Sequence, residues 1–390
     1  MNKGKIYNIF LRELGREEEV VNLIPSECPL PPICSPYLET NVHQKYAEGY
    51  PGKRYYNGCK IIDELETAVI EEVAKNFNCK FANVQPHSGS TANQAVYKAS
   101  GKWFKQRGFV GGITPTLSMS LDSGGHLSHF SVASFGKHDS HSFYDVTPDG
   151  SIDLVRIYDW LSKHAFGVVV IGASSYPLKI PYEEMSKIFQ KYKDFFIVFD
   201  VSHIAGLIVG GQHENPANYD WGEGNTWCIT STTHKTYGGP RHAIIAWNDE
   251  KLTQPINHAV FPEMQGGANF AIIAALGEWA EYINENKEIY RTLQSNILKN
   301  CQRLVEPLKD KLVFGRTENH LALVRCKSKE HAQRVADKLE ESKIIVNVNG
   351  MFDGTWGIRI GATYETLAIN EKLEWEKIGA YINYVIDNLE

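Results

Sequence analysis

Short apolar runs alternate along the chain with longer segments in which apolar residues recur at helical spacing. The runs are too short for helices and almost continuously apolar, which is typical of strands buried on both faces of a parallel sheet. Strands and helices in alternation predict an α/β fold with a mostly parallel central sheet covered on both faces. The expected strands lie at residues 81–84, 168–171, 195–199 and 227–232, and the expected helices at 92–104 and 181–193.

The two ends of the chain have different patterns. Residues up to about 20 predict an amphipathic helix, and residues 21–60 are rich in Pro, Tyr and Gly and predict an ordered loop region. A long helical pattern at 270–308 precedes shorter elements, which are a strand at 320–325, a helix at 329–342 and strands at 344–348 and 357–361. We therefore predict an N-terminal helical arm (1–20), a large domain (21–268), and a linker helix with a small α+β C-terminal domain (269–390).

Composition narrows the class of protein. The 390 residues carry a net charge of −6 with no basic block, which argues against a nucleic-acid partner. No apolar segment is long enough for a bilayer, and the N-terminus does not lead into a signal-peptide core. The seven cysteines are scattered and odd in number, as expected for reduced thiols in a cytoplasmic protein.

A hydroxyl-rich strand end carries the most distinctive lysine. The run 227–232 ends at Thr232, and Thr233, His234 and Lys235 follow directly. Lysine becomes a useful imine nucleophile when burial or nearby cations lower its pKa. The position suits a lysine that forms a Schiff base with pyridoxal 5'-phosphate (PLP), although an ordinary strand-end lysine fits the same pattern.

Asp200 stands at the end of another run, 195–199. Active-site groups of α/β sheets cluster at the carboxyl ends of strands. A carboxylate there can pair with the protonated pyridine nitrogen of PLP and keep the ring an electron sink. A helix cap or turn aspartate would give the same pattern.

Two glycine-containing loops could complete such a site. Ser88-Gly89-Ser90 comes just before the helical pattern at 92–104, where free N–H groups and the helix dipole favour a phosphate, although a plain turn is also consistent. Gly124-Gly125-His126 holds an imidazole that could stack on a planar ring. Because zinc-spaced cysteines and a His-Glu-x-x-His helix are both missing, we predict no metal site. The alternative metal ligands would be His126, His129, His138 and His141.

Together these motifs resemble the serine hydroxymethyltransferase family, whose members have the aspartate-aminotransferase-like fold, PLP-dependent fold type I. The resemblance runs from about Asn22 to Tyr364. Its most specific part is KYAEGYPGKRYY at 45–56. Further matching segments are ANVQPHSGS at 82–90, GGHL at 124–127, TTHKT at 232–236 and GIRIG at 357–361.

The resemblance implies a role for each matching residue. The catalytic residues would be Lys235 as the Schiff-base lysine, Asp200 as the pyridine partner, His126 as the stacking ring, His203, Tyr56 and the acid/base Glu48. The cofactor would be held by Ser88, Gly89, Ser90, His126, Ser174, Asp200, His203, His234, Lys235 and, reaching into the partner subunit, Gly267. The amino acid would contact Ser26, Tyr46, Tyr56 and Arg359, and the folate slot would include Leu121, Leu127 and Asn349.

The implied activity is reversible retro-aldol transfer of a one-carbon unit between serine and tetrahydrofolate. The implied assembly is a homodimer with shared active sites, or a tetramer built from such dimers. Neither a nucleic acid nor a membrane is an expected partner.

Some positions depart from the family pattern. Pro25 and Cys28 stand where the family commonly has Ala and Asn, Ser123 stands where it has His, and His242-Ala243 replaces a glycine pair. The segment 347–357, near the folate slot, is several residues shorter than usual. The alternative is therefore a folate-independent threonine aldolase or transaldolase, or a hydroxymethyltransferase for an unusual amino acid.

Overall fold

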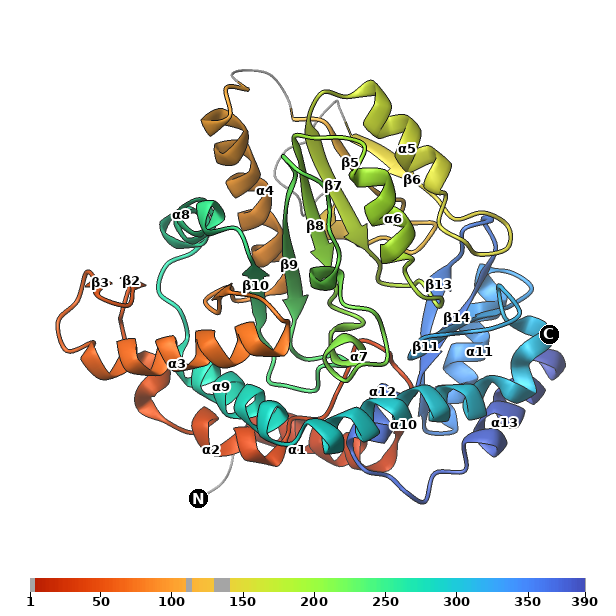
Figure 1. The fold of residues 1–390 in the computed structure, drawn as a ribbon. Helices are drawn as coiled ribbons and strands as arrows, with labels where there is room; N and C mark the ends of the chain where they lie inside the picture. The colour runs from red at the N-terminus through yellow and green to blue at the C-terminus, as the bar shows by residue number, and fades with distance from the viewer. Residues whose placement is uncertain (1–3, 110–113, 130–140, 390) are drawn as a thin grey trace.

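The computed structural model describes residues 4–109, 114–129 and 141–389, and its largest feature is a mixed central sheet (Figure 1). The strand order is β4-β10-β9-β8-β7-β5-β6. Neighbours from β9 to β6 pair in parallel, while β10 runs antiparallel to β9 and β4. This confirms the predicted α/β class. The strands are β4 (Phe81–Asn83), β5 (Thr116–Met119), β6 (His141–Tyr144), β7 (Gly167–Gly172), β8 (Phe195–Asp200), β9 (Thr226–Thr232) and β10 (Ala243–Trp247).

The continuous apolar strands divide their side chains between two cores. In β8, Phe196 and Val198 face a core shared with α4 and α8, while Phe195, Ile197 and Phe199 face a second core with α3 and α9. Successive strand residues point to opposite faces, so a strand covered on both sides must be apolar throughout. The helices on these two faces are α3 (Lys60–Asn76), α4 (Gly89–Gln106), α5 (Leu154–Lys163), α6 (Tyr182–Phe189), α7 (Ala205–Val209), α8 (Thr253–His258) and α9 (Phe270–Glu285).

A small antiparallel sheet, ordered β11-β14-β13, lies beside the large one and has its own core with α11 and α13. Helix α10 contributes Tyr290 to a core of the large sheet and Cys301 to the small core, so it connects the two. Leu23 also packs into the small core, although it comes from the other end of the chain. The elements are α10 (Lys287–Val305), β11 (Leu321–Arg325), α11 (Lys329–Glu341), β13 (Asn347–Gly350), β14 (Trp356–Gly361), α12 (Thr363–Leu367) and α13 (Trp375–Asn388).

Two predicted elements are divided in the structure. The helical pattern at 270–308 is broken at Asn286, whose φ of −117° and ψ of 43° end α9 and cap α10. The expected strand at 344–348 is two strands, because β12 (Ile344–Ile345) pairs in parallel with β1 (Val21–Asn22) while β13 joins the small sheet. Apolar spacing does not show which partner a strand chooses, so this change of partner was invisible in the sequence.

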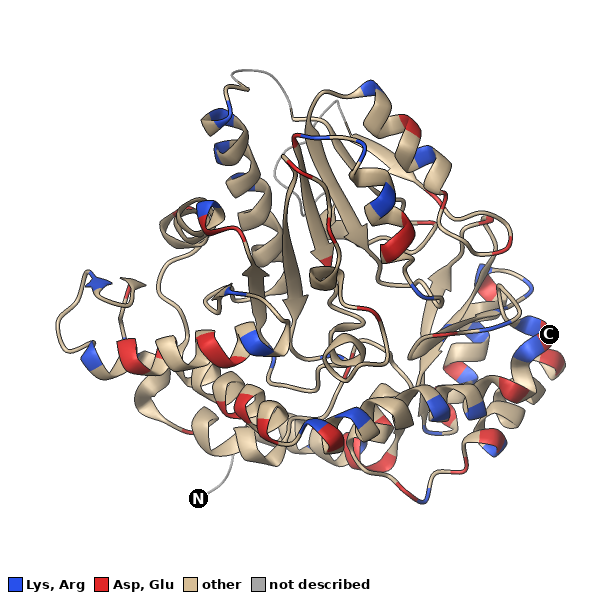
Figure 2. Ribbon diagram, in the orientation of Figure 1, with Lys and Arg blue, Asp and Glu red and all other residues tan. Residues whose placement is uncertain are grey.

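The N-terminal part is helical and largely exposed. Helix α1 (Lys5–Glu19) buries none of its residues, and its apolar side chains, Phe10 and Leu14 among them, face outward. It is followed by α2 (Ser35–Leu38) and a hairpin of β2 (Gly49–Tyr50) with β3 (Lys53–Arg54). Acidic and basic residues are intermixed along the outer helices (Figure 2). Over the described ranges, no helix is both long and apolar enough to cross a bilayer.

Candidate active site

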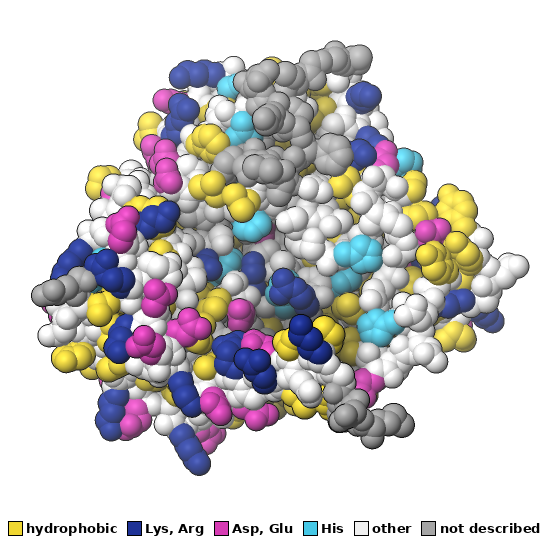
Figure 3. All heavy atoms as spheres, turned by 180° about the vertical axis from the view of Figure 1, so that it is seen from behind, with side chains coloured by type: hydrophobic (Ala, Val, Ile, Leu, Met, Phe, Trp, Pro, Cys, Tyr) yellow, Lys and Arg dark blue, Asp and Glu magenta, His cyan; other side chains and the backbone are white. Residues whose placement is uncertain are grey.

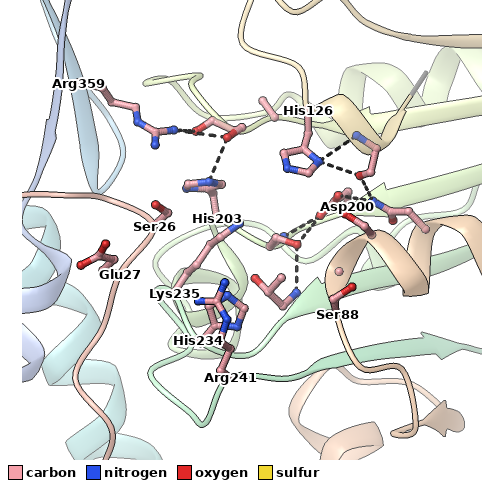
Figure 4. A pocket seen from close by; sticks show the side chains of 18 residues that line it. Ser26, Glu27, Ser88, His126, Asp200, His203, His234, Lys235, Arg241 and Arg359 are labelled. Carbon is pink, nitrogen blue, oxygen red and sulfur yellow. Dashed lines mark hydrogen bonds between the residues drawn. The ribbon is translucent and has the colours of Figure 1, made fainter. Parts of the chain in front are cut away.

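The carboxyl ends of β7, β8 and β9 open into a cavity of about 410 Å³ between the large and small sheets (Figure 4). On the face opposite to that in Figure 1, histidine and basic side chains gather around a hollow near the middle (Figure 3). The cavity brings together most of the site residues named from the sequence. These are Ser26, Ser88, Gly89, Ser90, His126, Ser174, Asp200, His203, His234, Lys235 and Arg359.

Asp200 is held as a carboxylate by a dense set of donors. Oδ2 accepts from Asn93 Nδ2 at 2.8 Å and pairs with His129 Nε2 at 2.9 Å, while Oδ1 accepts from Ser202 Oγ at 2.6 Å. Burial alone would raise the pKa of Asp200. The hydrogen bond from His129, with the charges of His129 and His126, outweighs burial and brings the pKa well below its usual value. A fixed negative charge therefore faces the cavity.

Some residues at the site were not assigned a role there from the sequence. His129 was considered only as a metal ligand and Asn93 was not singled out, yet both hold Asp200. Glu27 and Arg241 also line the cavity. The available signal for Glu27 was its position directly after Ser26, a residue already named from the sequence. His129 lies 71 positions from Asp200, and only the folded chain shows that they meet.

Lys235 follows β9 and points into the cavity (Figure 4). Burial, together with the positive charges of Arg359 and Arg241, lowers its pKa from 10.5 to about 8, and the charge of Asp200 opposes the change. A substantial fraction of the amine is therefore neutral and nucleophilic near pH 8.

The cavity histidines are neutral at physiological pH. Burial, reinforced by the neighbouring cations, lowers the pKa of His234 to about 4 and that of His203 well below its usual value. Burial likewise lowers the pKa of His126 to about 4, although the charge of Asp200 acts in the opposite direction. The charges that remain are two guanidinium groups, one lysine and two carboxylates, so the wall carries a slight positive excess.

The start of α4 forms an anion cradle at one end of the cavity. Ser88 caps the helix by accepting from Thr91 N at 3.2 Å. A Cβ on Gly89 would lie 2.7 Å from Thr232 Cγ2, so a larger residue would disturb the packing there. Thr232 Oγ1 and His234 Nδ1 are buried without a hydrogen-bond partner among the described residues. Unpaired buried polar groups beside a helix N-terminus suit a phosphate.

Arg359 stands on β14 at the opposite side of the cavity (Figure 4). Its Nε donates to Asn347 Oδ1 at 3.1 Å, and its Nη1 donates to Ser174 O at 2.8 Å and Ser175 Oγ at 3.1 Å. No carboxylate of the described residues pairs with it, and burial lowers its pKa to about 10. The remaining terminal nitrogen is left for an anionic ligand.

The other named residues lie elsewhere. Within the described ranges, the cavity wall includes none of Tyr46, Glu48, Tyr56 and Gly267. These four form a separate group: the ring centroids of Tyr46 and Tyr56 are 5.5 Å apart, and Glu48 packs against Gly266 and Gly267. Partial burial and the negative charge of Glu48 raise the pKa of Tyr56.

The residues expected in a folate slot are near the turn 123–126 and in β13. Leu121 and Leu127 are 42% and 52% exposed. Asn349 is engaged within the chain, since its Oδ1 accepts from Ser175 Oγ at 3.2 Å. Of the alternative metal ligands, His138 lies outside the described residues, and the described part of the chain has no group of three residues that could hold a metal ion.

Comparison with known proteins agrees with this arrangement. A family model described as serine hydroxymethyltransferase matches residues 1–382. The chain belongs to the serine hydroxymethyltransferase family. It is 37% identical to the serine hydroxymethyltransferase of Campylobacter hominis over 396 residues, which cover 99% of this chain and 91% of that protein. It is 36% identical to the enzyme of Campylobacter jejuni (99% and 91% covered) and 35% identical to that of Rickettsia massiliae (99% and 90% covered).

Serine hydroxymethyltransferases depend on PLP, and the residues present fit this cofactor. The cavity offers a phosphate cradle with two unpaired buried polar atoms, a fixed carboxylate at Asp200 and a lysine of lowered pKa. These groups lie at separate points of one cavity wall. PLP likewise has a phosphate, a ring nitrogen and an aldehyde at separate points of its ring, and each needs its own partner.

Proposed function

We propose that this chain is a PLP-dependent enzyme that transfers the hydroxymethyl group between serine and tetrahydrofolate, with glycine as the other product. The observation that carries the proposal is the single cavity that joins Lys235, Asp200 and Arg359 in a chain of this family. The comparisons do not favour the aldolase alternative. Formation of glycine from serine in the presence of tetrahydrofolate tests the proposal.

The cavity residues have separate proposed roles in binding the amino acid, binding the cofactor and controlling protonation. We propose that Arg359 binds the carboxylate of the amino acid, with Ser26 beside it, and that the start of α4 with His234 holds the cofactor phosphate. His126 would lie against the cofactor ring and His203 near its hydroxyl. Asp200 would keep the ring nitrogen protonated, because an adjacent fixed carboxylate raises the pKa of that nitrogen. When bound, PLP supplies the electron sink for cleavage of the Cα–Cβ bond.

We expect the pH dependence of cofactor attachment to report the lowered pKa of Lys235. Only the neutral amine attacks an aldehyde, so the rate constant for PLP attachment to the apoprotein should rise with pH, reach half of its maximum near pH 8 and level off above about pH 9. Stopped-flow absorbance across the range from about pH 6 to pH 10 measures it. A rate constant that still rises steeply above about pH 9 would mean that Lys235 keeps an ordinary lysine pKa.

We propose a homodimer in which Tyr46, Glu48, Tyr56 and Gly267 complete the site of the partner subunit. Their position outside the cavity of their own chain supports this, as do exposed apolar side chains in the N-terminal part. Tyr55 and Ile61 are 77% and 70% exposed, and helix α1 buries none of its residues. Exposed apolar side chains of this kind are common at interfaces.

Mixed dimers test the sharing of sites. Lys235→Ala and Glu48→Gln should each be inactive as a pure dimer. Refolding them together in equal amounts should restore roughly a quarter of the wild-type activity, because half of the dimers are mixed and each carries one intact site. Activity that stays at the level of the pure variants would place Lys235 and Glu48 in the same chain's site.

The folate side of the site is the part that departs from the family. Met351 is buried and Phe352 packs on Phe314 with ring centroids 5.1 Å apart, so both residues pack the shortened loop. We propose that the pterin ring binds between Leu121, Leu127 and Asn349, with Glu48 of the partner managing the proton of the one-carbon unit. Fewer contacts from the short loop should weaken tetrahydrofolate binding relative to a typical family member.

Three further proposals concern the whole chain. Separate cores support the division into an arm (1–20), a large domain (21–268) and a small domain with its linker helix (269–390), except that Leu23 packs with the small core. The seven free cysteines support a cytoplasmic location. A tetramer built from two such dimers is the next assembly to test.

A further inference from the structure

A row of hydrogen bonds connects Asn349 to Arg359 through one hydroxyl group. Ser175 Oγ donates to Asn349 Oδ1 at 3.2 Å and accepts from Arg359 Nη1 at 3.1 Å. Ser175 and Arg359 are each 8% exposed, so water competes little for these bonds. The Ser175 hydroxyl group therefore donates one hydrogen bond and accepts another within the protein.

The strand register explains why these side chains meet. Asn347 is directly opposite Arg359 in the β13–β14 pair, and Asn349 is two residues further along β13. Residues i and i+2 of a strand share one face, so both asparagines project to the same side as Arg359. Ser175 follows β7 in the large domain and meets this face from the other side of the cavity.

We infer that Ser175 is a positioning residue: it fixes the orientation of Arg359 toward the amino-acid carboxylate and passes to Arg359 the influence of Asn349. The inference rests on the proposed function, which makes Arg359 the carboxylate ligand and places Asn349 on the folate side. A hydroxyl that donates is polarised into a better acceptor, so the bond to Asn349 strengthens the bond from Arg359. Asn349 thus acts on the carboxylate site without touching it.

The geometry separates this relay from the other holds on Arg359, which are Asn347 at Nε and the carbonyl oxygen of Ser174 at Nη1. Asn347 binds Nε directly, whereas Asn349 reaches Nη1 only through Ser175. The other side of the Asn349 amide is also engaged, since Nδ2 donates to Gly350 O. The side chain of Asn349 is therefore oriented before any ligand arrives, and its oxygen is aimed at Ser175.

A double-mutant cycle on glycine affinity tests the relay. Holoenzyme is titrated with glycine without folate, and the dissociation constant is read from the absorbance of the bound cofactor. Ser175→Ala should weaken glycine binding about tenfold, the size expected for one hydrogen bond to a charged group. Asn349→Ala should weaken it less, about threefold. The double variant should bind glycine no more weakly than Ser175→Ala alone, because the relay is already cut.

Two controls separate positioning from structural damage. Thr355→Ala changes the same β13–β14 loop at an exposed residue and should leave glycine affinity unchanged. Methoxyamine is an amine without a carboxylate, so its rate of reaction with the lysine-bound cofactor should be the same in Ser175→Ala as in the wild type. A slower reaction would show general damage to the site and overturn the relay.

The remaining outcomes are equally decisive. Normal glycine affinity in Ser175→Ala, or losses that add up fully in the double variant, would overturn the relay and leave the proposed function standing. A wild-type protein whose cofactor absorbance does not respond to glycine would overturn both.

Discussion

Replacing Lys235 by alanine is expected to lower kcat by about a thousandfold or more, the scale seen when a central catalytic group is removed. Lys235 is the buried amine that faces Asp200, Arg359 and Arg241, and these surroundings give it a pKa of about 8. Burial beside cationic groups favours the neutral form of a lysine, which is the form that acts as a nucleophile. The same surroundings would destabilise a charged lysine with a purely structural role.

The same variant should still fold and still bind PLP without a covalent bond. The start of α4, Thr232 and Asp200 remain in the cavity wall, and these are the groups proposed as the phosphate cradle and the ring-nitrogen partner. Absorbance spectra and mass spectrometry of the intact protein distinguish bound from covalently attached cofactor. Lys251→Ala, at an exposed lysine, is the matched control and should behave as wild type. Wild-type turnover in Lys235→Ala would remove Lys235 from the mechanism.

Arg359→Lys is expected to weaken glycine and serine binding by about 1.5–3 kcal/mol, or about 10- to 150-fold. The guanidinium already holds Asn347 and Ser174 with Nε and Nη1, which orients its remaining nitrogen toward the cavity. A lysine ammonium is a compact charge and cannot keep these bonds while also binding a carboxylate. Arg359 has no carboxylate partner among the described residues. Its positive charge is therefore fully available to the carboxylate of the bound amino acid.

Titration with glycine, followed by cofactor absorbance, measures this loss. The matched control is Arg325→Lys on the neighbouring strand β11, where the arginine pairs with Asp353 at the surface. That change should leave glycine affinity within about twofold, because exposed ion pairs contribute little and the residue is not in the cavity wall. Unchanged glycine affinity in Arg359→Lys would move the carboxylate site elsewhere.

The sequence predicted the parts of the site that lie next to a regular element. Lys235 follows β9, Asp200 ends β8 and Ser88 precedes α4, and in each case a short apolar run or a helical pattern marks the position. Parallel strands bring their carboxyl ends to one edge, so these residues had to converge.

Contacts between distant segments were not predictable in this way. His129 reaches Asp200 only because the turn at 123–129 folds over the end of β8, and no periodic pattern encodes that approach. The change of sheet between Ile345 and Asn347 was also not predictable, because the pairing partner of each strand depends on segments that are distant in the sequence.

The departures from the family pattern have structural partners in this chain. Ser123 Oγ donates to Asp145 Oδ1 at 3.0 Å, which ties the turn before His126 to the end of β6. His242 Nε2 lies 2.7 Å from Val84 O, next to the loop that leads into α4. Cys28 Sγ lies 3.8 Å from Gly239 O. None of these three residues is among the described residues that line the cavity, so the substitutions leave its wall intact.

Conversion of serine to glycine, measured with and without tetrahydrofolate, tests the central claim most directly. Glycine and a folate-bound one-carbon unit are expected in equal amounts, with little glycine formed when folate is left out. A higher folate concentration than usual for the family should be needed for half-maximal rate, because the segment 347–357 is short. Glycine formation from serine that does not depend on folate, or folate-independent cleavage of allo-threonine with none of serine, would contradict the account and favour the aldolase alternative.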